Sequence, residues 1–546
     1  MHGLMQDAPL TLPHFVHRAE TLFADKEVVT ATPTGRHHVN YGEWAERARR
    51  LGGVLDALGI SDAGRVATFA WNTSRHLELY FAAPCTGRVL HTLNIRLFPD
   101  QIIYVVNHAA DEVIFVDRSL VELLAPLIDR LPTVKHVVVM GEAGDDLPSL
   151  PGGPDVHDYE ALLAAASPVA FAVDDERRAA SMCYTSGTTG NPKGVVSTHR
   201  STFLHTLGVL AAGTFGITET DRILPVVPMF HANAWGLAHA AVAAGASLVL
   251  PGPDLSGPTI ATLFEDERVT VAAGVPTVWM GVLPQLGDRD LSDLRMIVCG
   301  GSAVPKVLSE AYRDATGLPI LQAWGMTETS PAASVCHIKS TIDRTLDDDG
   351  RAEVRTSIGQ PIIGVEARVA RDGSAEPVPP DGTTPGELQV RGPWIAAGYY
   401  DDPRSSESFT DDGWLRTGDV ATLDAHGYLR LVDRTKDVIK SGGEWISSVD
   451  LENELMAHPA VAEACVVGVP HPRWAERPLA CVVLRPGADT THEELRTFLA
   501  DRVAKWWLPD DIVFVDQIPK TSVGKFSKKD LRERYAERYV TASTEA

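Results

Sequence analysis

The sequence predicts an α/β protein: a large N-terminal domain of layered sheets with helices and a β-rich subdomain, then a small α+β domain. Short apolar runs alternate with amphipathic stretches between about residues 26 and 340. The chain becomes rich in Gly, Pro and Asp between about 350 and 433, and helix–strand alternation resumes after about 437. Such alternation is typical of a largely parallel sheet with helices on its faces. The 546 residues suffice for a sizeable core and for three or four units of about 150 residues.

The first part of the chain contains apolar runs of the length of buried strands, separated by helical patterns. The stretch 41–58 predicts an amphipathic helix, because Leu51, Val54, Leu55 and Leu58 lie on one helical face. Short apolar runs bounded by turn signals read as strands that are covered on both faces. We expect such strands at 66–70, 113–117, 136–140, 223–227, 247–251, 296–300 and 320–324.

The later part of the chain predicts two smaller units. Between about 350 and 433, strand-like runs at 366–370, 386–390 and 427–432 are separated by turn residues, which indicates a β-rich subdomain. Helix, two strands, helix, strand and helix then follow, and together they predict the small α+β domain. We expect these six elements at 449–457, 463–469, 479–484, 492–506, 512–516 and 528–539.

Composition excludes several classes of function. The net charge of −23 and the pI near 5.2 argue against a nucleic-acid partner, because phosphate backbones are bound by clustered Lys and Arg. No run of about 18 strongly apolar residues predicts a transmembrane helix, and the N-terminus does not resemble a signal peptide. The six cysteines are scattered without a CxxC pair, which favours reduced thiols in a cytoplasmic protein.

The string TSGTTGNPKG, residues 185–194, has the composition of a phosphate-binding loop. Its glycines let the backbone approach an anion, its hydroxyls and amides can surround phosphate oxygens, and Lys193 supplies a positive charge. The apolar run AASMCY precedes it, so we expect the loop to leave a strand. The spacing differs from the common G-x-x-x-x-G-K-[ST] pattern, because Lys193 follows Gly190 by three and precedes Gly194.

Seven further motifs accompany this loop: PMFHANAW (228–235), GGSAVP (300–305), QAWGMTETSP (322–331), GELQVRGP (386–393), GWLRTGDVA (413–421), DRTKDVIKSGGEWIS (433–447) and PKTSVGKF (519–526). In this order, and over nearly the whole chain, they resemble the adenylate-forming superfamily of acyl-CoA synthetases, adenylation domains of peptide synthetases and firefly-type luciferases. The resemblance implies that a carboxylate attacks the α-phosphate of ATP, giving an acyl-AMP and pyrophosphate, and that a thiol then displaces AMP. Both steps place negative charge on oxygens, so the site needs positioned cations and donors.

The resemblance also assigns nucleotide contacts. Glu328 and Thr185 would bind Mg²⁺, a hard cation that prefers oxygen ligands, and Asp419 would accept both ribose hydroxyls, reinforced by Arg434. The family usually has Tyr where Trp324 stands, so stacking on the adenine is kept but a phenol contact is lost. The residues assigned to ATP or AMP are Thr185, Ser186, Gly187, Thr188, Thr189, Gly190, Lys193, Ala232, Gly301, Ser302, Ala303, Gln322, Ala323, Trp324, Gly325, Thr327, Asp419, Arg434, Lys436, Lys440 and Trp445.

Catalysis is assigned by resemblance to both domains. Lys525, in SVGKF, matches the lysine that bridges the carboxylate and the α-phosphate during adenylation. Lys436 matches the hinge about which the small domain rotates, and rotation would bring Lys440 to the nucleotide for thioester formation, with Gly442 and Gly443 towards CoA. The implied domains are 1–433, with the β-rich subdomain at about 350–433, a hinge at 434–439, and 440–546.

Two residues of PMFHANAW bear on the acid. The resemblance implies that His231 closes the acyl site during adenylation, and that Trp235 gates an acyl tunnel as in long-chain fatty acyl-CoA synthetases. We therefore expect a medium- to long-chain fatty acid, although Trp235 could equally be a core anchor. Ligases for short sulfur-containing acids or aryl and arylalkanoic acids remain the alternative.

Three more distant functions remain open. A carrier-protein adenylation enzyme and a luciferase-like oxygenase would share the ATP motifs. A non-catalytic nucleotide-binding protein would also share them, but the presence of Glu328, Lys440 and Lys525 argues against it. By analogy with long-chain relatives, and because residues 1–25 are unusually apolar for a free tail, we expect a homodimer.

Overall fold

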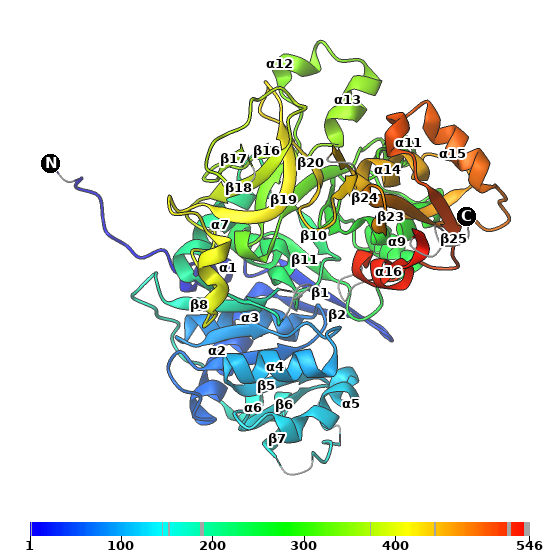
Figure 1. Ribbon diagram of the computed structural model, residues 1–546. Helices are drawn as coiled ribbons and strands as arrows, with labels where there is room; N and C mark the ends of the chain where they lie inside the picture. Colours follow the sequence, from blue (N-terminus) through cyan, green and yellow to red (C-terminus); the bar gives the residue numbers. More distant parts are fainter. Residues whose placement is uncertain are drawn as a thin grey trace.

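The computed structural model describes residues 1, 3–142, 144, 146–150, 153–185, 191–371, 373–441, 444–520 and 526–539, with the backbone alone at 444 and 445. Across these ranges, no helix combines the length and the apolar character that crossing a bilayer requires. The chain forms a large α/β domain, a β-rich subdomain beside it, and a smaller C-terminal domain (Figure 1).

One sheet has seven strands within the described ranges and lies at the bottom of Figure 1. Its strands are β3 (Arg65–Phe69), β4 (Val89–Thr92), β5 (Asp111–Asp117), β6 (His136–Met140), β7 (Asp155–Asp158), β8 (Ala179–Tyr184) and β9 (Gly194–Thr198). They follow the order β7-β6-β5-β3-β4-β8-β9, and all neighbours are parallel except β8 and β9. Strand β8 ends at Tyr184, directly before the string at 185–194, so the strand predicted to precede it forms.

A second sheet has nine strands in the described structure. They are β1 (Glu27–Thr32), β2 (Gly35–Asn40), β10 (Arg222–Pro225), β11 (Ser247–Leu250), β12 (Val271–Gly274), β13 (Met296–Cys299), β14 (Leu321–Gly325), β15 (Ala332–Val335) and β16 (Gln360–Pro361). The order is β16-β15-β14-β13-β12-β10-β11-β1-β2, with a parallel centre and antiparallel strands β2, β15 and β16 at the edges. The seven predicted buried strands all form, β3, β5 and β6 in the first sheet and β10, β11, β13 and β14 in the second.

Helices fill the space between the two sheets and cover their outer faces. The central helices are α1 (Pro13–Leu22), α2 (Tyr41–Ala57), α3 (Ser74–Cys85), α6 (Tyr159–Ala165), α7 (His199–Leu210) and α8 (Leu237–Ala244). The outer elements are α4 (Pro99–Ala109), η1 (Arg118–Leu120), α5 (Val121–Leu124) and η2 (Ala125–Arg130) on one sheet, and α9 (Gly257–Asp266), α10 (Pro276–Val282), η4 (Leu283–Gln285) and α11 (Lys306–Thr316) on the other. The largest core cluster joins α1, α2, α3 and α8 to inner-face residues of both sheets, which gives the layered architecture that the sequence predicts. The predicted helix 41–58 forms as α2, and its first turn is stabilised by a capping box between Asn40 and Glu43.

The β-rich subdomain is an antiparallel sheet. In the described residues its strands are β17 (Glu366–Ala370), β18 (Gly386–Arg391), β19 (Leu415–Leu423) and β20 (Leu429–Arg434), with η6 (Pro403–Ser408) on the connection from β18 to β19. The predicted strands form, but β19 was not expected as a strand because RTGD reads as a polar motif. It forms because alternate side chains, including Leu415 and Thr417, are buried.

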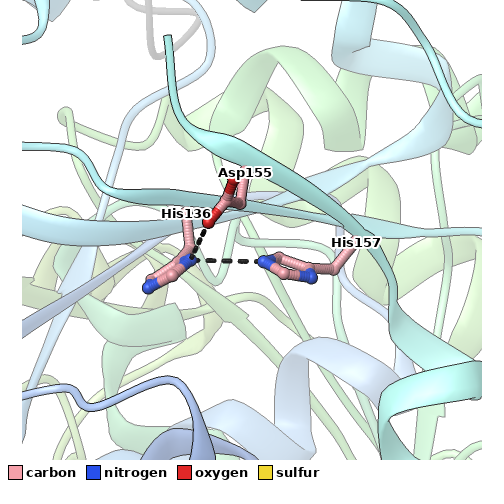
Figure 2. A group of neighbouring side chains, drawn as sticks. All are labelled: His136, Asp155 and His157. Atoms are coloured by element: carbon pink, nitrogen blue, oxygen red, sulfur yellow. Dashed lines mark hydrogen bonds and ion pairs between the residues drawn. The ribbon is translucent and has the colours of Figure 1, made fainter.

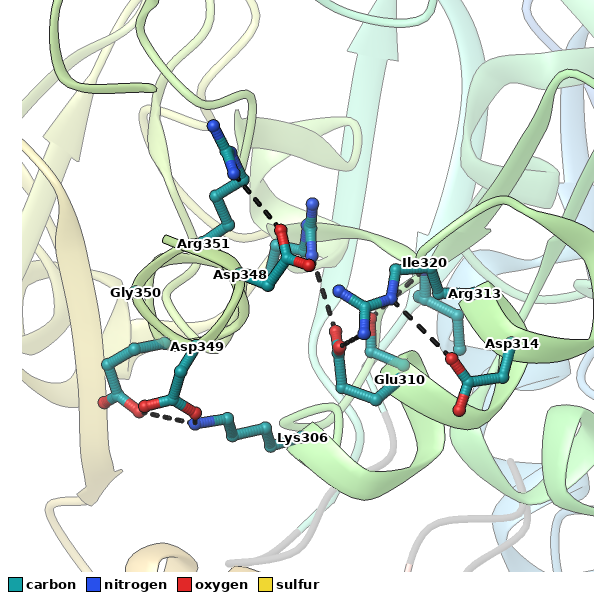
Figure 3. Close-up of polar contacts among 12 residues, drawn as sticks. Lys306, Glu310, Arg313, Asp314, Ile320, Asp348, Asp349, Gly350 and Arg351 are labelled. Carbon is teal, nitrogen blue, oxygen red and sulfur yellow. Dashed lines mark hydrogen bonds and ion pairs between the residues drawn. The ribbon is translucent and has the colours of Figure 1, made fainter. Parts of the chain in front are cut away.

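Residues 348–355 differ from the β-rich character expected near 350. Between η5 (Thr327–Thr329) and β17 lie two helices, α12 (Ser340–Asp343) and α13 (Asp348–Arg355). The Asp347 side chain caps α13 by accepting a hydrogen bond from Gly350 N, and acidic residues in the first turn complement the helix dipole. Ion pairs join α13 to α11: Lys306 Nζ lies 2.7 Å from Asp349 Oδ1 (Figure 3), and Arg355 pairs with Glu310 at 3.4 Å.

The small domain contains β21 (Ile439–Ser441), β22 (Glu444–Ile446), α14 (Ser448–Met456), β23 (Val461–His471), β24 (Ala475–Leu484), α15 (His492–Ala500), η7 (Lys505–Trp507), β25 (Asp511–Phe514) and α16 (Lys528–Tyr535). The predicted order of elements is confirmed, but the helix expected at 492–506 ends at Ala500. After Ala500 the backbone leaves α-helical geometry, because Asp501 has φ −94° and ψ 0° and Arg502 N bonds to the Leu499 carbonyl in the i→i+3 pattern of a tighter turn.

The small domain is anchored at the end of β20. Buried Asp433 accepts a hydrogen bond from Ser448 N at 3.1 Å, and the Ser447 hydroxyl donates to Val432 O at 2.7 Å. Lys528 on α16 lies 3.0 Å from Glu452 and 3.9 Å from Asp433. The connection from β20 to β21, which carries Lys436, is therefore flanked by polar contacts between the two parts of the chain.

Candidate active site

A cavity of about 390 Å³ lies where the large sheets meet the β-rich subdomain. The loop after β8, the segment after β10, the ends of β13 and β14, and strands β19 and β20 all contribute to its wall. Twelve of the residues predicted from the sequence line it within the described structure. They are Thr185, Lys193, His231, Ala232, Trp235, Gly301, Ala323, Trp324, Gly325, Thr327, Glu328 and Arg434.

Asp419 is bound by an aromatic and a cationic side chain that both line the cavity. Trp324 donates its indole N–H to Asp419 Oδ2 at 2.8 Å, and Arg434 Nε lies 2.6 Å from Asp419 Oδ1. Antiparallel pairing of β19 with β20 places Asp419 opposite Arg434, so the ion pair follows from the sheet register. The Asp419 carboxylate raises the pKa of Arg434 above its usual value. Both partners of Asp419 line the cavity.

Glu328 lines the cavity, and this residue is only 5% exposed. Tyr399 donates its hydroxyl to Glu328 Oε1 at 2.7 Å, and Lys193 Nζ lies 4.3 Å from the centre of the Tyr399 ring. Burial raises the pKa of Glu328, while the Tyr399 hydrogen bond and the charges of Arg434 and Lys193 act in the opposite direction. The result is a buried carboxylate beside a cation, within a chain that is acidic overall.

Lys193 is positioned by the backbone at both ends of the glycine-rich loop. Thr185 N donates to Lys193 O at 3.0 Å, and Lys193 N donates to Thr185 Oγ1 at 3.1 Å. The Lys193 ammonium donates to Ser408 Oγ at 3.3 Å. Arg404, Arg416 and Arg434 also line the cavity, so its described wall carries four cationic side chains. Such a wall favours an anionic ligand.

The segment from His231 to Trp235 has an unusual backbone. Ala232, Asn233, Ala234 and Trp235, in η3 (Ala232–Gly236), all have φ between 45° and 57°, the left-handed region that non-glycine residues rarely adopt. The Asn233 side chain holds this turn, because it donates to Ser181 Oγ and accepts from Cys183 Sγ, both at 3.1 Å. The turn aims His231 and Trp235 into the cavity.

The Trp235 indole packs beside Gly300, where the backbone of Gly300 and the carbonyl of Ala323 lie close together. A Cβ atom placed on Gly300 would lie 3.2 Å from the Trp235 indole and 2.7 Å from the carbonyl oxygen of Ala323. Glycine at 300 therefore makes room for the indole. The cavity wall also includes the apolar residues Phe215, Val227, Pro228, Val275, Pro331 and Ala332.

Behind η3 lies a second cavity of about 20 Å³, enough for about one water molecule. Its lining includes Cys183, His205, Asn233 and His239. Burial lowers the pKa of His205 to about 3 and that of His239 to about 4, so both imidazoles are neutral at pH 7. This space is polar and small, and the apolar wall of the main cavity is the better place for an alkyl or aryl group.

Six predicted residues do not line the main cavity although the structure describes them. Asp419 contacts Trp324 and Arg434, which line the cavity. Gln322 is buried, and its Oε1 accepts a hydrogen bond from Val304 N at 3.1 Å. Lys440 is exposed on β21. The other three are Ser302, Ala303 and Lys436. Outside the described residues lie Ser186, Gly187, Thr188, Thr189, Gly190, Gly442, Gly443, Lys525 and the side chain of Trp445.

Sequence reasoning missed several lining residues. Thr417 and Gly418 belong to RTGD and could have been found there, since a motif that supplies Asp419 also supplies its neighbours. Tyr399 follows GELQVRGPWIAAG without a recognised pattern, and only the structure shows its bond to Glu328. Arg416 is the first residue of RTGD and could have been found in the same way, whereas Arg404 and Ser408 had no local signal.

Comparison with known proteins identifies the family of the chain. A model described as "AMP-binding enzyme" matches residues 16–400, and one described as "AMP-binding enzyme C-terminal domain" matches residues 450–525. A long-chain-fatty-acid–CoA ligase of Thermus thermophilus is 48% identical over 541 residues, covering 98% of this chain and 97% of the relative. A 3-methylmercaptopropionyl-CoA ligase of Ruegeria lacuscaerulensis is 42% identical over 540 residues, covering 98% and 99%.

A solved structure of an anthranilate CoA ligase in complex with anthranoyl-AMP superposes with a TM-score of 0.86. It is 26% identical and covers 99% of this chain and 100% of that one. The family models together with these full-length similarities establish the relationship that the motifs predict. The chain belongs to the AMP-binding enzymes, the adenylate-forming superfamily.

Proposed function

We propose that the protein is an ATP-dependent acid–CoA ligase whose acid is a medium- to long-chain fatty acid. In the first step the carboxylate attacks the α-phosphate of ATP, giving acyl-AMP and pyrophosphate. In the second step the thiol of CoA attacks the acyl carbon, giving acyl-CoA and AMP. The observation that carries the proposal is the set of groups that one cavity brings together: Trp324 and Arg434, which hold Asp419, buried Glu328 with the cationic side chains, and an apolar part of the wall that includes Trp235.

These groups match the parts of an acyl-adenylate, which are the nucleoside, the phosphate and the acyl chain. The ribose hydroxyls would donate to Asp419, which Trp324 and Arg434 hold in place, and the adenine would lie along Ala323, Trp324 and Gly325. The phosphates would lie among the four cationic side chains, which offset the charge that develops during transfer. The acyl group would then extend past His231 to the apolar residues.

Mg²⁺ is the proposed metal ion, and the residues present fit it. Glu328 is a buried carboxylate with one oxygen engaged by Tyr399, and Thr185 adds a hydroxyl oxygen on the same cavity wall. A hard divalent cation prefers such oxygen ligands together with substrate phosphates. When bound, Mg²⁺ would neutralise phosphate charge, while Glu328 and Thr185 would hold it.

Domain movement is part of the proposal. We propose a large domain at 1–433, a hinge at 434–439 and a small domain at 440–546. Lys440 is the exposed residue of β21 and does not line the cavity, so a rotation about Lys436 is needed to bring it to the nucleotide. Lys525 would act in adenylation in the alternate orientation.

Trp235 and the size of the cavity bear on the chain length of the acid. The cavity of about 390 Å³ is at the small end of the range of ligand pockets, about 300–1,000 Å³. A nucleotide and a long acyl chain fit together only if the indole leaves Gly300 and opens the apolar end. The Thermus relative is a long-chain fatty acid ligase, whereas the Ruegeria relative acts on a short sulfur-containing acid, which remains the second candidate.

The test is AMP and acyl-CoA formation from ATP, Mg²⁺ and CoA with acids from acetate to palmitate, cinnamate and 3-(methylthio)propionate. A maximum between octanoate and palmitate is the expected result. Turnover confined to short or aryl acids would keep the reaction but overturn the fatty-acid assignment. No turnover with any acid would favour another acceptor or a non-catalytic nucleotide-binding role.

The same panel of acids, assayed with Trp235→Ala, tests whether Trp235 gates the acyl site. An unchanged chain-length profile would make Trp235 a core anchor. Trp474→Ala is the control, because Trp474 is an exposed tryptophan of the small domain.

Trp324→Phe is expected to raise the KM for ATP about tenfold while leaving the preference among acids unchanged. Phenylalanine keeps an aromatic face but removes the N–H that binds Asp419 Oδ2, and a hydrogen bond to a charged group contributes about 1.5 kcal/mol or more. The measurement is the KM for ATP at a saturating acid. Trp279→Phe is the matched control, because that buried indole donates to the Val298 carbonyl at 3.1 Å and neither residue lines the cavity. An unchanged KM for ATP would show that Asp419 does not depend on Trp324.

A cytoplasmic homodimer completes the proposal. The N-terminal segment extends away from the body of the molecule in Figure 1, and Leu4 and Met5 are 93% and 88% exposed. Exposed apolar residues on an extended arm favour contact with a second copy. Sedimentation of the intact chain against a variant lacking residues 1–9 would test the arm, with a monomeric intact chain overturning it.

A further inference from the structure

Three potential metal ligands converge at the outer edge of the seven-stranded sheet, on β6 and the edge strand β7. The parallel register pairs His136 with Asp155 and Val138 with His157. Side chains two residues apart on a strand lie on the same face, so Asp155 and His157 both project beside His136. Figure 2 shows the two imidazoles and the carboxylate turned towards one another. None of the three lines the cavities described above, so the cluster is separate from the proposed active site.

The distances are close to those of a metal site. His136 Nδ1 lies 3.2 Å from His157 Nε2 and 4.0 Å from Asp155 Oδ2, and the three ligand atoms all lie within 4.8 Å of one another. Two nitrogens on a tetrahedral zinc ion are about 3.3 Å apart, given Zn–N bonds of about 2.0–2.1 Å. The Asp155 side chain is 81% exposed, so its carboxylate can rotate the remaining distance without disturbing the core.

A hydrogen bond fixes the imidazole of His136 in the tautomer that a metal requires. His136 Nε2 lies 3.0 Å from the carbonyl oxygen of Leu58, the residue that ends α2. A carbonyl can only accept, so Nε2 carries the proton and Nδ1 keeps its lone pair towards His157 and Asp155. A ligating histidine commonly donates its other N–H to a backbone carbonyl in this way, which orients the ring.

We propose that His136 Nδ1, His157 Nε2 and Asp155 bind a divalent transition-metal ion of the zinc type at this sheet edge. Two imidazoles and one carboxylate suit Zn²⁺ better than Mg²⁺ or Ca²⁺, which prefer oxygen ligands throughout. The exposed side of the cluster leaves a fourth position for water. Among the described residues, no other three His, Cys, Asp or Glu side chains converge in this way.

The ion has a structural role in this proposal. It ties the edge strand β7 to β6 and, through the His136–Leu58 bond, to the end of α2. The chain leaves β7 directly into α6, where Tyr159 and Glu160 bond to Glu78, Arg47 and Arg75. Metal binding would therefore stabilise the edge of the sheet against opening, since an ion that binds the folded state alone raises its stability.

The test uses the full chain, stripped with EDTA and exchanged into buffer without metal. Titration with Zn²⁺ by calorimetry is expected to show one site per chain and a rise in melting temperature. His157→Gln should weaken this binding at least tenfold and abolish the thermal shift, and Asp155→Asn should weaken it less. Co²⁺ should give a spectrum without thiolate bands, because the cysteines are buried.

His38→Gln is the matched control, because His38 lies 3.7 Å from Glu27 in a surface pair without a third ligand. It should leave the Zn²⁺ affinity within twofold of the unchanged chain. Equal melting temperatures of His157→Gln and the unchanged chain without metal would show that the variant folds. Zn²⁺ binding that is unaltered in His157→Gln, or absent from the unchanged chain, would overturn the proposal.

Discussion

Lys525→Ala is expected to lower acyl-AMP formation by a factor of about 10²–10³ while leaving thioester formation from supplied acyl-AMP and CoA within a few-fold. A preorganised cation aimed at the developing charge contributes on this scale. In the proposed cycle Lys525 serves adenylation only and leaves the nucleotide before CoA reacts. The two half-reactions are measured separately, as ATP–pyrophosphate exchange with the acid and as acyl-CoA release from the adenylate.

Lys440→Ala should give the reciprocal result, with the thioester step reduced and the exchange reaction preserved. Lys440 is exposed on β21 away from the cavity, so its loss should not disturb the nucleotide site. Lys529→Ala, an exposed residue of α16 paired with Glu533, is the control and should alter neither step. Equal losses in both half-reactions from either variant would contradict two orientations of the small domain.

Asp419→Ala is expected to reduce kcat/KM for ATP by about 10²–10³. The carboxylate is 3% exposed and would accept two ribose hydroxyls, each a hydrogen bond to a charged group contributing about 1.5–3 kcal/mol. Removal also leaves Arg434 without its partner at 2.6 Å and the Trp324 N–H without its acceptor. The measurement is kcat/KM for ATP and, as a comparison, for 2′-deoxy-ATP.

The comparison with 2′-deoxy-ATP separates binding of the ribose from loss of structure. The unchanged enzyme should discriminate against the deoxynucleotide, and Asp419→Ala should lose most of that discrimination. Asp412→Ala is the control, since Asp412 pairs with Arg368 near the surface of the same subdomain and lies away from the cavity. Undiminished discrimination in Asp419→Ala would place the ribose elsewhere.

Local patterns predicted much of this protein because they report local physics. The buried strands β3, β5 and β13 and the helix α2 are visible as apolar runs and as a helical face. The division of these strands between two sheets is set by long-range pairing, such as β1 with β11, which no local window contains. Helix α13 was missed because its stability comes from a cap and from ion pairs to α11.

The candidate site shows the same division. Glu328, Asp419 and Lys193 were predicted because they lie within recognisable motifs. Tyr399 was not, because it reaches Glu328 from a residue 71 positions away and has no motif of its own. The bond between Trp324 and Asp419 likewise joins residues 95 apart, and a sequence that predicts both does not predict that they touch.

The left-handed turn at η3 has a consequence for how this enzyme can be improved or can evolve. Each non-glycine residue in that conformation costs about 1–2 kcal/mol, and four follow one another from Ala232 to Trp235. The free energy of unfolding of a folded domain is only about 5–15 kcal/mol, so the strain in this turn is large compared with the net stability. Glycine at Ala232 or Ala234 would relieve the strain, and selection for thermal resistance would favour such changes. The same changes would hold His231 and Trp235 less firmly in position. A gain in thermal stability would therefore lower the selectivity for the acid, and a gain in selectivity would lower thermal stability.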